Sequence, residues 1–502
     1  MRAQISRRTL LKTTGAAAGV AATAAVATAP PAAAAGTAFA HPGLLHTAAD
    51  LDRMAAKVAA GAAPYKAGYA RLAANAHAQS TWTARPQATV YRGSGSPQNY
   101  SLLYNDAHAA YQNALRAHVT GEQAYADTAV AILNAWSSTL TQVAGSADRF
   151  LAAGLYGYQL ANAAELVRDH DGFELARFQM LLSKVIAPLS DDFLANHNGA
   201  VITNYWPNWD LCAMACVLAT GIFCDDKSQV ARAVDYFKNG TGLGAVRNAI
   251  PVVYGNGLGE WLEAGRDQGH SLLGVGLMGT VCEMAWNQGI DLYGYDDNRF
   301  LKGAQYVAKW NLGGDVRYTA NTRAKGAVNG WHGTETASDV AGADPTMIRP
   351  VWAMISNHYT KRRGLSAPYL TQIAAKAAPE GGGGDYGPNS GGYDQLGFGT
   401  LAFTRDRASV SVESGTGSSS AASPQASGKS SGTAAGSADG TGAGSGAATP
   451  SAAASAQGGT GQDLADTGSS DLPAWTAASG IAAVAGGLLL LRRRNRAARN
   501  SR

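Results

Sequence analysis

The chain has 502 residues, 46% of them hydrophobic, which is enough to bury a large core. Its formal net charge is +4, and the excess lies at the ends: four positive charges precede residue 36, and a net five follow Thr467. If both ends are removed, the remainder carries a charge of −5. Such a remainder has no basic field, which argues against nucleic acid as a partner.

The first 40 residues have the pattern of an export signal. They contain "SRRTLLK" (6–12), then an alanine-rich apolar run, then the small residues of "PAAAAGTAFA" (31–40). This order predicts a twin-arginine signal peptide over residues 1–40, with the twin-arginine translocase as a partner. Such a signal implies export of a folded protein. The alternative is an N-terminal helix flanked by basic residues.

Residues 41–407 are predicted to form one domain built from helices. In "HTAADLDRMAAKVA" (46–59), Thr47 and Asp50 have the spacing of a capping box and precede a one-sided apolar pattern. "SQVARAVDYFKNG" (228–240) and "DNRFLKGAQYVAKW" (297–310) are also apolar on one face. By contrast, "NWDLCAMACVLATGIF" (208–223) and "SLLGVGLMGTVCEMAW" (271–286) have almost no polar face and are expected to be buried.

Half-buried and buried helices that alternate along a chain predict an all-α fold with two layers. We expect an (α/α) toroid, an incomplete barrel of inner and outer helices. A stacked solenoid is the alternative, but the sequence has no fixed-period repeat to favour it. The glycine-rich end of the domain, "GGGGDYGPNSGGYDQLGFGTLAFTRD" (381–406), is expected to pack back as a loop or small hairpin.

Two further segments follow the domain. Residues 408–463 are rich in Ser, Gly and Ala and lack large apolar residues, so they predict a flexible, wall-spanning linker. Residues 464–502 resemble a sortase sorting signal: "LADTG" (464–468, with Leu464, Thr467 and Gly468), an apolar segment (472–491) and an arginine-rich tail (492–502). We expect a sortase to cut after Thr467 and join the chain to peptidoglycan. The alternative is a permanent membrane anchor.

The toroid fold predicts where chemistry can lie. Its inner helices run in one direction, so their N-termini meet at one rim. Two stretches are expected to open inner helices there, "NYWPNWD" (204–210) and "GRDQGH" (265–270). A long loop (313–344) leads into a third inner helix, "PTMIRPVWAMISNHY" (345–359), with Pro345 in its first turn. The opposite rim is about a helix length away, so Tyr293 and Tyr295 are poor partners for His270.

Three stretches resemble a known family, namely residues 106–136, 197–217 and 265–301. They are similar to the alginate-lyase-like polysaccharide lyases of the (α/α) toroid class. The resemblance implies that the chain cleaves a uronic-acid polysaccharide, alginate or glucuronan, by β-elimination. An anionic polysaccharide is then the expected partner.

The resemblance also implies site residues. β-Elimination removes the C5 proton next to the uronate carboxylate, so the site needs donors for the carboxylate, a base at C5 and an acid for the leaving O4. The family pattern places these roles on Asn204 or Asn208 and on His270. Arg266, beside His270 in the sequence, is a further donor suited to the carboxylate. The chain has no tyrosine one or two turns after His270. We therefore expect the phenol from one of two residues, and substrate contacts from five others: Tyr205 or Tyr318 for the phenol, and Gln268, Trp206, Trp331, His332 and Arg349 for the substrate.

Each candidate has a structural alternative. His270 and the two asparagines could serve only as helix caps, Arg266 could serve only as an ion-pair partner of Asp267 or Glu263, and the two tryptophans could be core residues. The four cysteines, Cys212, Cys216, Cys224 and Cys282, have no ligands at a metal-binding spacing, so neither a metal nor another cofactor is predicted. A bridge between Cys224 and Cys282 stays open.

Two other functions compete with the lyase hypothesis. One is a non-catalytic wall protein that binds glycans on the same toroid. The other is a toroid glycoside hydrolase, which needs a pair of carboxylates across the site. The predicted rim carries five carboxylates without an evident pair: Asp210, Glu260, Glu263, Asp267 and Glu335.

Overall fold

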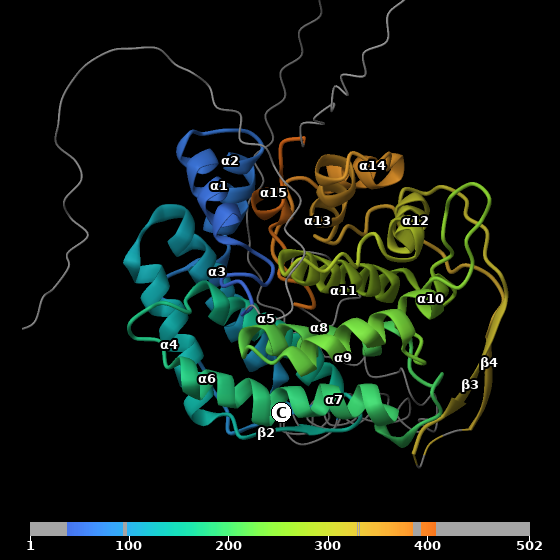
Figure 1. Ribbon diagram of the computed structural model, residues 1–502, viewed down its shortest axis with the longest axis horizontal. Helices are drawn as coiled ribbons and strands as arrows, with labels where there is room; N and C mark the ends of the chain where they lie inside the picture. The colour runs from blue at the N-terminus through green and yellow to red at the C-terminus, as the bar shows by residue number, and fades with distance from the viewer. Residues whose placement is uncertain (1–37, 94–97, 329, 331, 385–392, 408–502) are drawn as a thin grey trace, which may run out of the picture.

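The computed structural model describes residues 38–93, 98–328, 330, 332–384 and 393–407. Nearly all of the predicted signal peptide (1–40), and all of the predicted linker (408–463) and sorting signal (464–502), lie outside these residues. Within the described part, no helix is both long enough and apolar enough to cross a membrane. The described chain forms two layers of helices with two small sheets at the edges (Figure 1).

The inner layer consists of five helices that pack side by side in chain order. α8 and α11 are buried along nearly their whole length, as their apolar sequences predict. The five are α3 (Tyr100–Thr120), α5 (Arg149–Leu166), α8 (Pro207–Phe223), α11 (Gln268–Asn287) and α13 (Trp352–Asn357).

The outer helices return the chain from the end of one inner helix to the start of the next. Because each return reverses direction, the inner helices run the same way. The outer helices are α4 (Gln123–Thr139), α6 (Leu175–Leu181) and α7 (Ala187–Asn196) with a π-turn between them (η2, Leu182–Ile186), α9 (Lys227–Asn239), α12 (Tyr295–Asn311) and α14 (Pro368–Ala377). The predicted all-α toroid is confirmed.

The two ends of the domain pack together and bridge α3 and α13. Arg53 donates to the carbonyl of Ala402 at 2.7 Å, and Tyr65 donates to the carbonyl of Thr404 at 2.6 Å. The elements involved are α1 (Ala48–Ala59), α2 (Tyr65–Ala73) and α15 (Gly399–Ala402). Short helical turns complete the helical elements: α10 (Val246–Ala249), η1 (Ala76–Ala78), η3 (His197–Gly199), η4 (Leu262–Gly265) and η5 (His358–Arg362).

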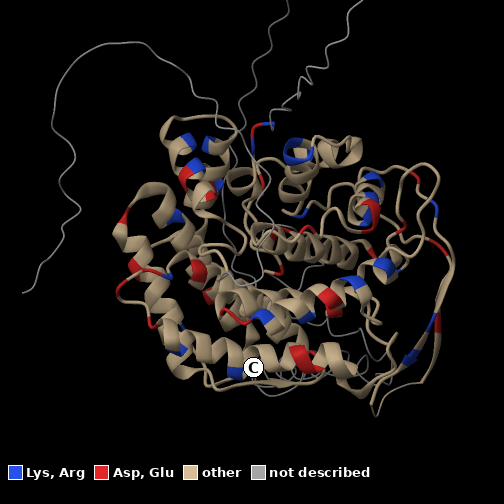
Figure 2. Ribbon diagram, viewed as in Figure 1, with Lys and Arg blue, Asp and Glu red and all other residues tan. Residues whose placement is uncertain are grey.

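Local signals in the sequence explain several helix boundaries. Thr47 accepts from the Asp50 amide while the Asp50 carboxylate accepts from the Thr47 amide, so the predicted capping box is present. α9 begins after Asp226, whose carboxylate accepts two backbone amides, and ends at Gly240 as predicted. The charged residues lie mainly on such outer helices and loops, with both signs interspersed (Figure 2).

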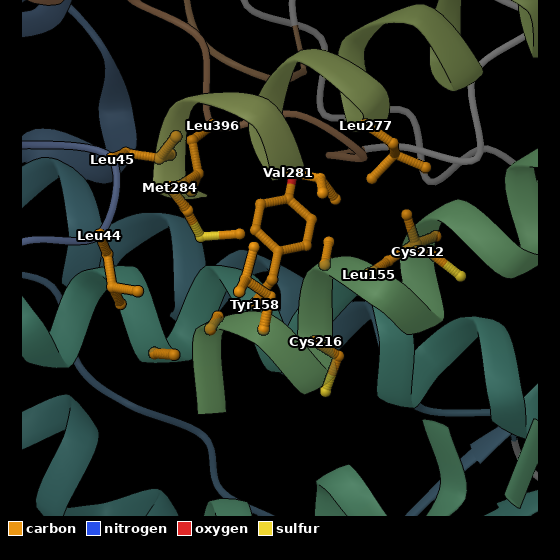
Figure 3. Close-up of a cluster of buried hydrophobic side chains, with 14 of the residues drawn as sticks. Leu44, Leu45, Leu155, Tyr158, Cys212, Cys216, Leu277, Val281, Met284 and Leu396 are labelled. Atoms are coloured by element: carbon orange, nitrogen blue, oxygen red, sulfur yellow. The ribbon is translucent and has the colours of Figure 1, made fainter. Parts of the chain in front are cut away.

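α5 and α8 pack closely against each other. A Cβ at Gly154 would lie 2.5 Å from the sulfur of Cys212, and a Cβ at Gly157 would lie 2.5 Å from the sulfur of Cys216. Glycine at both positions therefore lets the two helices approach closely. Figure 3 shows both cysteines in the core around Tyr158. All four cysteines are free, so the open question of a Cys224–Cys282 bridge is answered in the negative.

Two expectations for residues 313–359 are wrong. The third inner helix begins at Trp352, so Pro345 is not in its first turn. Pro350 disfavours helical backbone at the preceding residue, and the buried Glu380 carboxylate accepts the amides of Trp352 and Ala353 at 2.8 and 2.9 Å, which caps the helix there. The long loop also contains an antiparallel hairpin of β3 (Asn321–Gly326) and β4 (His332–Ala337).

The second sheet was not predicted. β1 (Thr89–Arg92) and β2 (Gln142–Gly145) pair in parallel just before α3 and α5 begin, which places both at the rim of the inner N-termini. The glycine-rich end of the domain was expected to form a loop or a small hairpin. In its described residues, Gly382 and Gly397 form an isolated antiparallel β-bridge.

Candidate active site

The N-termini of α8 and α11 are neighbours at one rim. Trp206, just before α8, has its ring 5.7 Å from the guanidinium of Arg266, just before α11. The two helices pack against each other along the inner layer. The polar residues that the sequence placed at the two helix starts therefore lie close together.

His270 is fixed by the residue that caps α11. Asp267 accepts the backbone amide of His270 through Oδ1 and contacts His270 Nδ1 through Oδ2, both at 2.7 Å. Burial alone would raise the pKa of Asp267, but the hydrogen bonds from His270 outweigh it and lower that pKa to about 2. Burial lowers the pKa of His270, although the bond to Asp267 opposes the shift. His270 is therefore held neutral against an ionised carboxylate near pH 7.

Arg266 defines which nitrogen of His270 carries the proton. Its Nη2 lies 3.2 Å from His270 Nε2, and a guanidinium can only donate. Nε2 is then the acceptor, and the proton sits on Nδ1, where it is donated to Asp267. The result is an imidazole whose Nε2 lone pair is directed at Arg266, and not into the core. Such a group can act as a general base once the lone pair is free.

Glu263 holds the other arm of Arg266. Its Oε1 accepts from Arg266 Nη1 at 3.0 Å. The carboxyl is fully buried, and burial raises its pKa to about 7 despite the nearby guanidinium. Its Oε2 has no hydrogen-bond partner among the described residues.

The two candidate asparagines are both buried at the start of α8. The carbonyl oxygen of Asn204 accepts the amide of Gly326 at 2.9 Å, which fastens the hairpin to the rim. Its amide nitrogen, and the carbonyl oxygen of Asn208, have no partner among the described residues. Buried amide groups are seldom left without partners, so these two atoms are free to bind a ligand if one reaches them.

Trp206 does not offer an open face to a sugar. The residue is 5% exposed, and two guanidiniums lie near its ring, that of Arg266 at 5.7 Å and that of Arg323 at 4.2 Å. The expectation that it stacks on substrate is wrong, because arginine covers the ring. Arg323 was not foreseen. It comes from β3, donates to the carbonyl of Thr203 at 2.8 Å and pairs with Glu335. No local sequence pattern distinguishes it from the other basic residues of the loop.

The two candidate phenols differ in position. Tyr205 is 2% exposed and packs on Phe193 and Trp209, with its hydroxyl taken by Asn198 at 3.1 Å. Tyr318 is half-buried and donates to the carbonyl of Leu262 at 2.9 Å. A Cβ at Gly265 would lie 2.2 Å from the Tyr318 hydroxyl oxygen, so this phenol rests against the segment that carries Arg266. Of the two, Tyr318 is the one beside the His270 group.

The remaining candidates are spread around the rim. The side-chain amide of Gln268 donates to the carbonyl of Asp344 and accepts from its backbone amide, so Gln268 fixes the loop before α13. Arg349 lies before α13, not one turn inside an inner helix, and its Nη1 is 3.5 Å from Asp394. His332 is exposed at the start of β4. Trp331 lies outside the described residues.

A second polar group at the same rim was not predicted from the sequence. Arg92, at the end of β1, donates to the hydroxyl of Tyr156 at 3.1 Å and lies 4.9 Å from the ring of Tyr100. Burial raises the pKa of Asp394, and both Arg92 and Arg349 oppose that shift. The residues come from β1, α3, α5 and the glycine-rich end, so sequence distance concealed them. An arginine that closes a short β-branched and aromatic run was the one available signal.

The comparisons with known proteins bear on the family. A family model described as alginate lyase matches residues 52–316, which is more than half of the chain. The chain belongs to the alginate lyase family. It is therefore a polysaccharide lyase and an enzyme.

Solved structures with a similar course of the chain are also alginate lyases. Alginate lyase A1-III of Sphingomonas species A1 is 14% identical, with 71% of this chain and 95% of that chain covered and a TM-score of 0.45. An alginate lyase from Bacteroides ovatus is 13% identical, with 52% and 82% covered and a TM-score of 0.38. A form of alginate lyase A1-III complexed with a tetrasaccharide is 15% identical, with 51% of this chain and 75% of that chain covered and a TM-score of 0.37. No curated protein matched the chain.

The five candidate carboxylates at the rim of this lyase each have a partner. Asp210 accepts from Tyr236 at 2.9 Å and lies 2.8 Å from His197, and Glu260 accepts the amide of Thr319 at 2.7 Å. The other three pair with Arg266, His270 and Arg323. Each of these five carboxylates is thus engaged by a basic side chain, a hydroxyl group or a backbone amide. Nor do the described residues contain a group of three or more His, Cys, Asp or Glu side chains suited to a metal ion.

Proposed function

We propose that this lyase cleaves a uronate polymer, alginate or glucuronan, by β-elimination at the rim formed by the N-termini of α8 and α11. The observation that carries the proposal is the contact of Arg266 with His270 Nε2. It sets a cation for a carboxylate directly beside a neutral base for the adjacent C–H. Helix N-termini at the same rim add further attraction for an anion.

The roles follow from the chemistry of elimination. Arg266 and Asn208 bind the carboxylate, which lowers the pKa of the C5 proton. His270 Nε2 takes that proton, the C5–H electrons form the C4–C5 double bond, and the C4–O4 bond breaks. The leaving O4 takes a proton from a phenol. Tyr318 suits this acid, because burial raises its pKa and keeps it protonated at neutral pH.

The proposed function predicts a product with a distinctive chromophore. Incubation with alginate, glucuronan and glycosaminoglycans should produce the ultraviolet absorbance of a conjugated, 4,5-unsaturated uronate with one of the uronate polymers. A neutral glucan serves as the substrate control, because it has no carboxylate to acidify the proton. Cleavage with new reducing ends but no chromophore on any uronate polymer would contradict β-elimination, and binding without cleavage would favour a glycan-binding role.

The location at the cell surface is part of the same proposal. The twin-arginine signal, the linker and the "LADTG" segment support export in a folded state and covalent attachment to peptidoglycan by a sortase. Wall-digesting enzymes should release the protein without its arginine-rich tail, and replacement of Thr467 by alanine should shift it to the membrane fraction. Recovery of the unmodified, full-length chain from membranes of cells with an intact Thr467 would count against the attachment.

A further inference from the structure

A buried carboxyl stands behind the proposed catalytic pair. Glu263, in η4, contacts Arg266 Nη1 through Oε1 at 3.0 Å, while Arg266 Nη2 faces His270 Nε2 at 3.2 Å. One guanidinium therefore connects Glu263 with the lone pair of His270. Asp267 fixes the other side of the imidazole at 2.7 Å. Arg266 Nε also lies 3.5 Å from Asp267 Oδ2, so the four side chains form one connected cluster.

We propose that Glu263 is a positioning residue that holds the Arg266 guanidinium across His270 Nε2, so that the substrate carboxylate must draw this arm of Arg266 aside before His270 can accept a proton. The inference rests on the proposed function and deepens it. In the free enzyme the base is covered. When a uronate arrives, its carboxylate takes over Arg266 Nη2, Glu263 retains Nη1, and the Nε2 lone pair is released next to the substrate.

A purely structural ion pair would be built differently. Glu263 is fully buried, yet only one of its oxygens is bound, and Oε2 has no partner among the described residues. An unpaired oxygen on a buried carboxylate is costly, so the arrangement gives little for stability alone. What it does provide is a fixed direction for the guanidinium.

The surroundings of Glu263 define its response to pH. The charged and titratable groups that face it are Arg266 and Asp267 at the start of α11, Arg323 from β3, and Tyr318 from the loop before β3. Burial raises its pKa to about 7, Asp267 adds to that shift, and Arg266 and Arg323 oppose it. Below this pH the carboxyl is protonated and its hold on Arg266 weakens. Above it, the carboxylate fixes Arg266 in place.

The test is a comparison of pH profiles. Glu263→Gln keeps an oxygen acceptor for Arg266 but cannot ionise, so it mimics the protonated state at every pH. The variant should match the wild type near about pH 5.5 and have a kcat/KM about tenfold lower near about pH 8.5, mainly through a higher KM. In the variant, kcat/KM should still rise with pH at values below the usual pKa of histidine, because His270 must lose its proton to act as the base.

Glu380→Gln is the matched control. Glu380 is a second buried carboxyl whose pKa is also raised by burial to about 7, but it caps α13 by accepting the backbone amides of Trp352 and Ala353. Its replacement should change kcat/KM by the same factor at all pH values. The proposal would be overturned if the ratio of kcat/KM between Glu263→Gln and the wild type were the same at all pH values. It would also be overturned if this ratio changed with pH equally for Glu380→Gln.

A second measurement needs no substrate and separates this inference from the proposed function. Nitrogen NMR of histidine-labelled protein, with His270 assigned by loss of its signals in His270→Gln, should show the tautomer with the proton on Nδ1. The other tautomer, or a protonated ring at neutral pH, would contradict the covered base even if the enzyme cleaves uronates. A correct tautomer with no unsaturated product on any polymer would instead refute the proposed function.

Discussion

Replacement of His270 by alanine is expected to lower kcat/KM for elimination by about two to four orders of magnitude, the usual effect of losing an acid–base residue. The physical reason is the loss of the Nε2 lone pair, which burial and the contact with Arg266 keep unprotonated while Asp267 holds the proton on Nδ1. The rate of formation of the unsaturated product measures the effect. His270→Gln should be equally impaired, and it retains a polar side chain beside Asp267 if the alanine variant does not fold.

His170 provides the matched control. It also pairs with an aspartate, with Nε2 3.0 Å from Asp127, but it lines a hollow of about 350 Å³ at the opposite rim. His170→Ala should leave the rate unchanged. A wild-type rate in a folded His270→Ala variant would return His270 to the role of a helix-terminal residue that only contacts its cap.

The second large effect is expected at the carboxylate site. Arg266→Ala and Asn208→Ala should each lower kcat/KM by about a hundredfold, because each removes a donor that neutralises the same carboxylate. The double variant should be far less impaired than the product of the two, with a coupling energy of about 1–3 kcal/mol. The neighbouring positions of Trp206 and Arg266 support this coupling, since they bring the starts of α8 and α11 together.

Stability must be followed in the same variants. Arg266→Ala leaves Glu263 buried without its partner, so its melting temperature is expected to fall. Arg266→Lys keeps the charge and should fold better, yet it loses the two-armed contact with Glu263 and His270. Arg363→Ala, which breaks a pair with Asp291 away from the site, controls for loss of an arginine. Fully multiplicative losses in folded single variants would mean that Arg266 and Asn208 do not share a carboxylate.

Much of the fold was accessible from the sequence because its signals are local. The Thr47–Asp50 capping box, the stop at Gly240 and the apolar length of α8 and α11 each depend on a few neighbouring residues. The spacing of "GRDQGH" likewise placed Arg266 and His270 one turn apart, where they do make contact.

The rest depended on contacts between distant segments. The hairpin of β3 and β4 is anchored by Asn204 from more than a hundred residues earlier, and no local pattern announces it. The burial of Trp206 was not predicted, because Arg323, which lies over its ring, comes from that hairpin. The start of α13 depends on Glu380, and the second group at the rim joins Arg92 to residues of three other segments.

The most direct test of β-elimination is cleavage of the accepted uronate polymer in water labelled with a heavy oxygen isotope, followed by mass spectrometry of the products. Elimination breaks the C4–O4 bond without adding water. The account therefore predicts that every cleavage leaves one fragment with an unsaturated non-reducing end, lighter than the corresponding hydrolysis product by one water, and that neither fragment acquires label during cleavage. Saturated products that carry one heavy oxygen for each bond cleaved would contradict it.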